Sequence, residues 1–280
     1  MKGPADNCSR PPIGQPIACF NRRRGKIPRG YIIIPSLCGQ NKLKIYPFAF
    51  RGERVNVGEK LRVVCYNIHS GKDRWGRWRL DQMADLLEQL QADVIALQEV
   101  HQNSRYGYQA DLLAERLHCT PIFAPAKQVS DGAYGNALLS RIPVLDSANM
   151  PLKTRGEPRS LLKNTLQYGR HLIDVWVTHC SLDRRSRGHQ LRAIHREIRQ
   201  HGARPLLIAG DFNTSTSPLS PLLQDCARES GTATATLVTI PRRIDYVYAS
   251  AEWQVEHCRV IRQKISDHYP LFVTLTLSDS

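Results

Sequence analysis

Pro205-Leu206-Leu207-Ile208-Ala209-Gly210-Asp211-Phe212-Asn213 is the stretch that decides the fold. Its apolar run, with Pro in front and Gly behind, predicts a short strand buried on both faces. Residues two apart on an extended chain point the same way, so we expect Asp211 and Asn213 to converge above the sheet edge, with Phe212 turned into the core. An anion and an amide aimed together suit a hydrated divalent cation or an attacking water. An ordinary strand-to-turn junction would use the same residue types.

Length and charge define the broad class of the protein. With 280 residues, of which 41% are hydrophobic, the chain can bury a sizeable core. The net charge of +14 suggests a polyanionic partner, either nucleic acid or an acidic lipid surface. Residues 1–60 contain 12 Lys and Arg against 3 Asp and Glu, so the remainder is only mildly basic.

The N-terminal part differs in composition from the rest. Residues 1–58 contain Arg22-Arg23-Arg24, several prolines and glycines, and only short apolar runs. This composition predicts a basic, disordered extension; a basic arm that grips phosphates is the alternative. We therefore expect one folded domain over residues 59–280.

Cysteine usage and hydropathy indicate the compartment. The eight cysteines show no CxxC spacing, and Cys65 lies in an apolar run, as expected of a buried thiol in a reducing compartment. No apolar stretch reaches the roughly 18 residues needed to cross a bilayer, and the first 30 residues contain no signal-peptide apolar core. The sequence predicts a cytoplasmic monomer without a transmembrane segment.

Polar side chains recur where apolar runs end. Helical spacing predicts amphipathic helices around residues 80–90, 112–117 and 191–198, and apolar runs between them predict strands. The strand at 61–68 delivers Asn67, the strand at 93–99 ends with Glu99, and a hairpin over 161–179 turns at Gly169. Further strands are predicted at 121–124, 253–260 and 271–277. The polar residues that we expect to meet at one sheet edge are Asn67, Glu99, His179, Asp211, Asn213, Asp245, Asp267 and His268.

The order of short motifs along the chain identifies a family resemblance. These motifs are Asn67, Leu97-Gln98-Glu99-Val100, Gly135-Asn136-Ala137-Leu138-Leu139-Ser140, Thr178-His179, Gly210-Asp211-Phe212-Asn213, Arg243-Ile244-Asp245-Tyr246 and Ser266-Asp267-His268. Together they resemble the endonuclease/exonuclease/phosphatase superfamily over about residues 60–278. The resemblance implies an α/β fold, a four-layer α/β/β/α sandwich of two packed, mostly antiparallel sheets flanked by helices. It also implies an enzyme that hydrolyses phosphate esters with Mg²⁺ or Mn²⁺.

The same resemblance implies roles for individual residues. Glu99 would be the principal metal ligand, helped by Asn67 and Asp267. His268 would transfer a proton while Asp245 holds its ring, and His179 would donate to a phosphoryl oxygen. Asp211 and Asn213 would orient the attacking water and the phosphate. Asn136 and Arg243 complete the expected set as substrate-binding residues.

The sequence leaves the substrate open. A phosphodiesterase or nuclease is the leading interpretation, and the Lys, Arg and Trp residues at 72–79 favour nucleic acid. A lipid or inositol phosphate head group would use similar cations. The alternative from another class is a non-catalytic module that binds nucleic acid through its basic arm.

Overall fold

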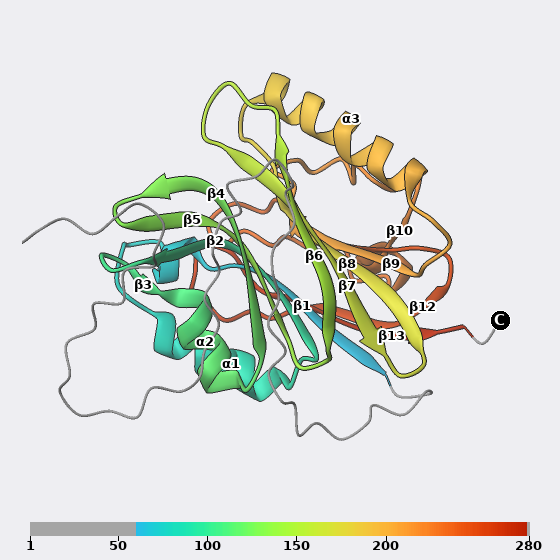
Figure 1. Cartoon of the computed structure of the whole chain (residues 1–280), viewed down its shortest axis with the longest axis horizontal. Helices are drawn as coiled ribbons and strands as arrows, with labels where there is room; N and C mark the ends of the chain where they lie inside the picture. Colours follow the sequence, from blue (N-terminus) through green and yellow to red (C-terminus); the bar gives the residue numbers. More distant parts are fainter. Residues whose placement is uncertain (1–59, 279–280) are drawn as a thin grey trace, which may run out of the picture. The chain divides into compact units, whose positions relative to one another are not determined.

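Two β-sheets form the centre of the folded part of the chain (Figure 1). The computed structural model describes residues 60–278, so the expected extension at 1–58 lies outside the described residues. The seven-stranded sheet has the order β12 (Trp253–Val260), β13 (Leu271–Leu277), β1 (Leu61–Asn67), β2 (Val94–Asn103), β5 (Gly132–Ser140) and β4 (Thr120–Val129), and the short β3 (Gly107–Tyr108) pairs with β2. The six-stranded sheet has the order β10 (Gln224–Asp225), β11 (Asp245–Ala249), β9 (Leu206–Asp211), β8 (His171–His179), β7 (Arg159–Tyr168) and β6 (Val144–Leu152).

Most neighbouring strands are antiparallel. The exceptions among residues 60–278 are β1 with β2 and β8 with β9, which pair in parallel. Parallel neighbours need a crossover connection, and a helix supplies it in both cases. These helices are α1 (Leu80–Leu90) between β1 and β2, and α3 (Arg184–Gln200) between β8 and β9. Each crossover brings two strand ends to the same edge of its sheet.

Alternation along the strands divides the buried side chains into three layers. Val63 and Cys65 of β1 lie in the core between the sheets, together with Leu207 and Ala209 of β9. The residues between them on each strand face outward, as the two-residue period requires. On β1 these outward residues, Val64 and Tyr66, pack under α1 and α2 (Gln109–Leu117). On β9, Leu206 and Ile208 pack with buried residues of α3.

The helices cover the outer faces of the two sheets. Figure 1 shows α1 and α2 on one side of the sheet pair and α3 on the other. In α2, Leu113 and Leu117 are buried but Leu112 is half exposed. Two shorter helical segments lie at His69–Gly71 (η1) and Cys226–Glu229 (α4). The expected four-layer α/β/β/α sandwich is therefore confirmed.

The predicted elements all occur in the structure, but several are longer than predicted. The strand expected at 121–124 is part of β4, and the helix expected around 191–198 is part of α3. The hairpin expected at 161–179 is formed by β7 and β8, and Gly169 has a φ of 56° at the turn. The strand predicted to end at Glu99 instead continues to Asn103.

Cys65 is buried, as expected. Among residues 60–278, no helix has the length and apolar character required to span a membrane.

Candidate active site

Three candidate residues lie side by side in one row of the six-stranded sheet. His179 is the last residue of β8, Asp211 is the last residue of β9, and the two are in register. Asp245 begins the antiparallel strand β11 and also pairs with Asp211. Residues in register on neighbouring strands point to the same face, so the imidazole and both carboxylates project together. Backbone hydrogen bonding of the sheet thus sets their spacing.

The turn after Asp211 explains the Gly-Asp-Phe-Asn sequence. A methyl group on Gly210 would lie 2.1 Å from the carbonyl oxygen of Thr178 on β8, so only glycine allows this close strand approach. Phe212 is fully buried against Tyr246 in an edge-to-face contact. Asn213 has a φ of 51°, and its backbone N–H donates to Asp211 Oδ1 at 2.8 Å. Phe212 therefore anchors the turn in the core while the polar residues on either side face the site.

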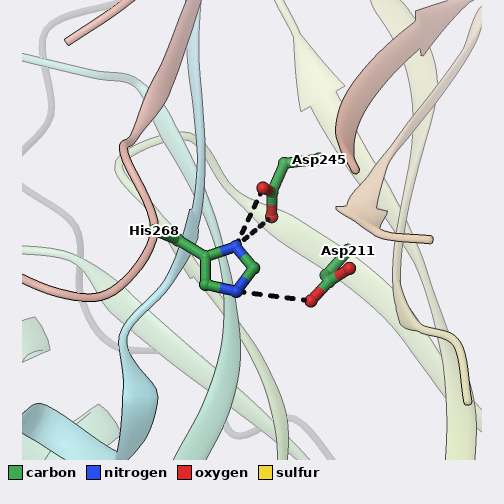
Figure 2. A group of neighbouring side chains, drawn as sticks. All are labelled: Asp211, Asp245 and His268. Carbon is green, nitrogen blue, oxygen red and sulfur yellow. Dashed lines mark hydrogen bonds and ion pairs between the residues drawn. The ribbon is translucent and has the colours of Figure 1, made fainter. Parts of the chain in front are cut away.

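His268 lies between the two carboxylates of this row (Figure 2). Its Nδ1 is 2.9 Å from Asp245 Oδ2, and its Nε2 is 3.7 Å from Asp211 Oδ2. Burial alone would lower the pKa of His268, but the carboxylates of Asp245, Asp211 and Asp267 raise this pKa to about 10. Burial and the charge of Asp245 raise the pKa of Asp211 to about 7, despite the opposing effect of His268. The ring is therefore cationic at neutral pH, with Asp245 as its closest carboxylate partner.

His179 occupies the opposite side of Asp211. Its Nε2 lies 3.5 Å from Asp211 Oδ2 and 3.3 Å from Asn213 Nδ2. The same amide nitrogen of Asn213 donates to the carbonyl oxygen of Cys180 at 2.9 Å, which fixes the side chain. Burial, followed by the positive charges of Arg159 and His268, holds the pKa of His179 well below its usual value. The two histidines of the site thus differ in charge at neutral pH.

Asn67 joins the two sheets at the site. Its Nδ2 donates to Glu99 Oε1 at 3.1 Å and to Asp211 Oδ2 at 3.2 Å, while its Oδ1 accepts the backbone N–H of His69. The carbonyl oxygen of Asn67 accepts a hydrogen bond from Ser266 Oγ, which holds the loop before β13. In this arrangement the amide nitrogen of Asn67, not its oxygen, faces the carboxylates, and metal ligation by Asn67 stays a prediction.

Glu99 lies in a β-bulge and not at a strand end. The register between β2 and β5 shifts between Leu97 and Val100, and Glu99 has a φ of 60°. A bulge of this kind changes the direction of a side chain without ending the strand, which is why the prediction of a strand end was wrong. The left-handed conformation costs about 1–2 kcal/mol for a residue with a Cβ atom. The chain accepts this strain and thereby directs the Glu99 carboxylate into the site.

A cavity of about 630 Å³ connects these groups. The candidate residues Glu99, His179, Asp211, Asn213, Asp267 and His268 all line it. Sequence reasoning missed a charged part of the cavity wall, where Arg159 Nη1 is 2.7 Å from Glu157 Oε2 and Lys127 Nζ is 3.8 Å from Glu157 Oε1. Arg159 is 92% buried and its Nε has no hydrogen-bond partner among residues 60–278. The sequence signal that could have indicated this part of the wall was the charged pair Glu157 and Arg159, which lies just before a predicted strand.

Comparison with known proteins places the chain in a family. The sequence profile of the Endonuclease/Exonuclease/phosphatase family matches residues 64–268. The chain belongs to this family. Members hydrolyse phosphate esters with divalent metals, so the protein is a phosphoric ester hydrolase. No curated protein sequence gives a significant match.

Solved structures show the same fold. An endonuclease/exonuclease/phosphatase from Beutenbergia cavernae DSM 12333 is 26% identical, with a TM-score of 0.69 over 78% of this chain and 72% of that one. A mannosyl-6-phosphatase from Bacteroides thetaiotaomicron VPI-5482 is 17% identical, with a TM-score of 0.67 over 78% and 100%. A humanized D. rerio TDP2 is 19% identical, with a TM-score of 0.66 over 78% and 99%. The last two comparisons show the fold alone.

Four residues assigned by the family resemblance do not line the cavity. Asn67 and Asp245 contact residues that do, whereas the two expected substrate-binding residues bind elsewhere in the fold. The Arg243 guanidinium binds the buried carboxylate of Asp225 and lies 4.3 Å from the ring centre of Tyr246. Asn136 is buried in β5, and its Nδ2 donates to the carbonyl oxygen of Ser160 at 3.1 Å. These contacts give both side chains a supporting position in the fold, so their placement does not support direct substrate binding.

Proposed function

We propose that this family member is a divalent-metal-dependent phosphodiesterase. The observation that carries the proposal is the charge of the cavity wall. Four carboxylates line the cavity, Glu99, Glu157, Asp211 and Asp267, against the cationic side chains of Lys127, Arg159 and His268. A phosphate anion entering beside clustered carboxylates is repelled unless a cation accompanies it. A diester carries one negative charge where a monoester carries up to two, so this wall favours the diester.

The donor set suits a hard divalent cation. Glu99 and Asp267 offer carboxylate oxygens to the cavity, which are the ligands that Mg²⁺ and Mn²⁺ prefer. Asp211, Asp245 and His268 also have possible ligand atoms within 4.8 Å of one another, but both ring nitrogens of His268 already face carboxylates. We therefore assign the metal to Glu99 and Asp267. When bound, it would neutralise a non-bridging oxygen and the leaving alkoxide.

Asp211 and His268 have the properties of an acid–base pair. Burial and the neighbouring carboxylate of Asp245 raise the pKa of Asp211, which makes it a stronger base than an ordinary carboxylate, able to take a proton from an attacking water. Asn67 and the backbone N–H of Asn213 hold the two oxygens of this carboxylate in place. Because His268 is cationic before reaction, it acts as the proton donor, and Asp245 keeps its ring oriented.

His179 and Asn213 complete the proposed site. The neutral ring of His179 is fixed beside Asp211 and carries one N–H for a phosphoryl oxygen. Arg159, on the strand next to that of His179, lines the same cavity and adds a positive charge there; its Nε has no hydrogen-bond partner among residues 60–278. The phosphate would thus meet donors on one side and the proposed metal ligands on the other.

Hydrolysis of matched aryl esters tests the proposal. The full-length protein is assayed with bis-p-nitrophenyl phosphate and with p-nitrophenyl phosphate, in EDTA and after addition of Mg²⁺ or Mn²⁺. We expect metal-dependent cleavage that favours the diester and is lost in Glu99→Gln. The matched control is Glu115→Gln, an exposed carboxylate on α2. Activity that persists in EDTA, or a clear preference for the monoester, would contradict the proposal.

A further inference from the structure

Helix α3 presents a row of basic side chains that the proposed chemistry does not use. Arg185, His189, Arg192, Arg196 and Arg199 follow one another at spacings of 4, 3, 4 and 3 residues, and all five are exposed. Residues three and four apart lie on the same face of a helix. These five residues, called the α3 stripe below, therefore form one continuous line of basic side chains, four of them arginines, on the outer surface of the six-stranded sheet.

The α3 stripe is not neutralised by other side chains of residues 60–278. Within residues 60–278, none of its arginines forms an ion pair, and its one described internal contact is a hydrogen bond between Arg192 and His189. Glu197, the one carboxylate within α3, binds Lys163 at 2.7 Å. Four unpaired arginines repel one another along a helix, at some cost in stability. An external anion would relieve this repulsion.

The inner face of α3 is committed to the core. Ile194 is fully buried among outward-facing residues of β8 and β9, and Gln190 is buried while its Oε1 accepts the backbone N–H of Ser181. The outer face carries no large apolar side chain between Arg184 and Gln200. Helices that lie in a membrane surface insert an apolar face among the lipids, and α3 has none to insert. The charge pattern alone is available for binding.

One end of the α3 stripe lies at the cavity. Leu182 lines the cavity, and Asp183 caps the helix by accepting the backbone N–H of Ser186 at 2.7 Å. Arg187 donates to the carbonyl oxygen of Leu182, which ties the first turn to the cavity rim. The loop before β7 also reaches this turn, because the backbone N–H of Arg155 donates to Ser186 Oγ at 3.0 Å. Basic residues thus continue from Arg159 in the cavity to the first turn of α3.

We propose that the α3 stripe is a docking surface for the sugar–phosphate backbone of a nucleic acid whose scissile phosphate lies in the cavity. The inference rests on the proposed function, because it names the substrate class of that site. From Arg185 to Arg199 the stripe is about 21 Å long at 1.5 Å per residue. At 3.4 Å of duplex axis per phosphate on one strand, this length corresponds to the axial rise of about six nucleotides, and the four arginines can contact up to about four phosphates. The substrate is therefore a polynucleotide and not a small phosphate ester.

The salt dependence of binding tests this inference. Anisotropy of a fluorescent 24-base-pair DNA duplex is measured from 50 to 200 mM salt in EDTA, so that binding is recorded without cleavage. The test variant carries Gln at Arg185, Arg192, Arg196 and Arg199. The control variant carries Gln at four exposed arginines outside α3, which are Arg116, Arg170, Arg228 and Arg259. Each lost phosphate contact reduces the slope of log K against log salt by about 0.9, so we expect a reduction of about 3 to 4 in the test variant and less than about 1 in the control.

The outcomes separate the possible partners. Thermal melting first establishes that both variants are folded. Equal slopes for wild type and test variant would overturn the inference. So would a wild-type protein that binds vesicles rich in phosphatidylserine through the α3 stripe but does not bind the duplex. Failure of the wild type to hydrolyse bis-p-nitrophenyl phosphate would refute the proposed function instead, because duplex binding in EDTA is measured independently.

Discussion

The left-handed backbone at Glu99 leads to a prediction about stability. Glycine usually makes a strand less stable than alanine does, and at this position we expect the reverse order. Glu99 has a φ of 60° inside β2. In this left-handed conformation the Cβ atom crowds the backbone and destabilises the fold by about 1–2 kcal/mol, whereas glycine has no Cβ atom and avoids this strain. Glycine lowers the free energy of unfolding by about 0.5–1 kcal/mol relative to alanine, because the unfolded chain has more conformational freedom at a glycine. Comparing Glu99→Gly with Glu99→Ala cancels the loss of the hydrogen bond from Asn67, since both variants lack the carboxylate. The glycine variant should therefore be more stable by about 0.5–1 kcal/mol.

Urea denaturation and thermal melting measure this difference. For a domain of this size, 1 kcal/mol corresponds to about 2–4 °C in Tm, so the two Glu99 variants should melt about 1–4 °C apart. Gln102 on the same strand is the matched control, because its φ is negative. There the order should reverse, with Gln102→Gly less stable than Gln102→Ala by about 0.5–1 kcal/mol. If glycine is the less stable residue at both positions, the strain argument is refuted. Both Glu99 variants should also lack metal-dependent hydrolysis.

Three further predictions concern the site and its support. His268→Ala should lower turnover of the aryl diester by about 10² to 10⁴ in steady-state kinetics, with the circular dichroism spectrum unchanged; a rate near wild type would exclude His268 as the proton donor. EDTA should abolish hydrolysis, and Mg²⁺ or Mn²⁺ should restore it, as a metal titration followed by rate measurement would show. Arg243→Ala should destabilise the protein by about 3–5 kcal/mol in urea denaturation, since it leaves Asp225 buried beside an exposed Arg228. The same variant should keep the wild-type KM for the aryl diester, and a raised KM would restore Arg243 as a substrate contact.

The ends of β1, β8 and β9 were predictable because each is marked by an apolar run that stops at a polar residue. The apolar run before Asp211 predicts β9, and the two-residue period predicts that Asp211 and Asn213 face one site while Phe212 is buried. The structure buries Phe212 and brings Asp211 and Asn213 to one site, but Asn213 gets there through a left-handed turn after the strand and not through strand alternation. Asn67 and His179 likewise end β1 and β8, as the apolar runs before them indicate. Periodicity therefore predicts these three strands and the direction of their last side chains, but not the position of Glu99.

The parts that sequence reasoning missed depend on long-range contacts. Nothing near Glu99 indicates a bulge, because its left-handed φ is imposed by pairing with β5 and no glycine marks it. Arg159 enters the site only because β7 lies beside β8 in the same sheet. The buried partner of Arg243 is Asp225, 18 residues earlier in the chain, on a two-residue strand that no pattern predicts. Such partners become visible only once the sheet order is known.

The row formed by His179, Asp211 and Asp245 ties chemistry to folding. These residues belong to three strands, and a slip of one strand by a single residue would turn its side chain to the opposite face. Partly folded or misregistered chains should therefore have no hydrolase activity, even when most of their secondary structure has formed. Recovery of hydrolysis during refolding would then count the molecules whose β8, β9 and β11 have reached native alignment.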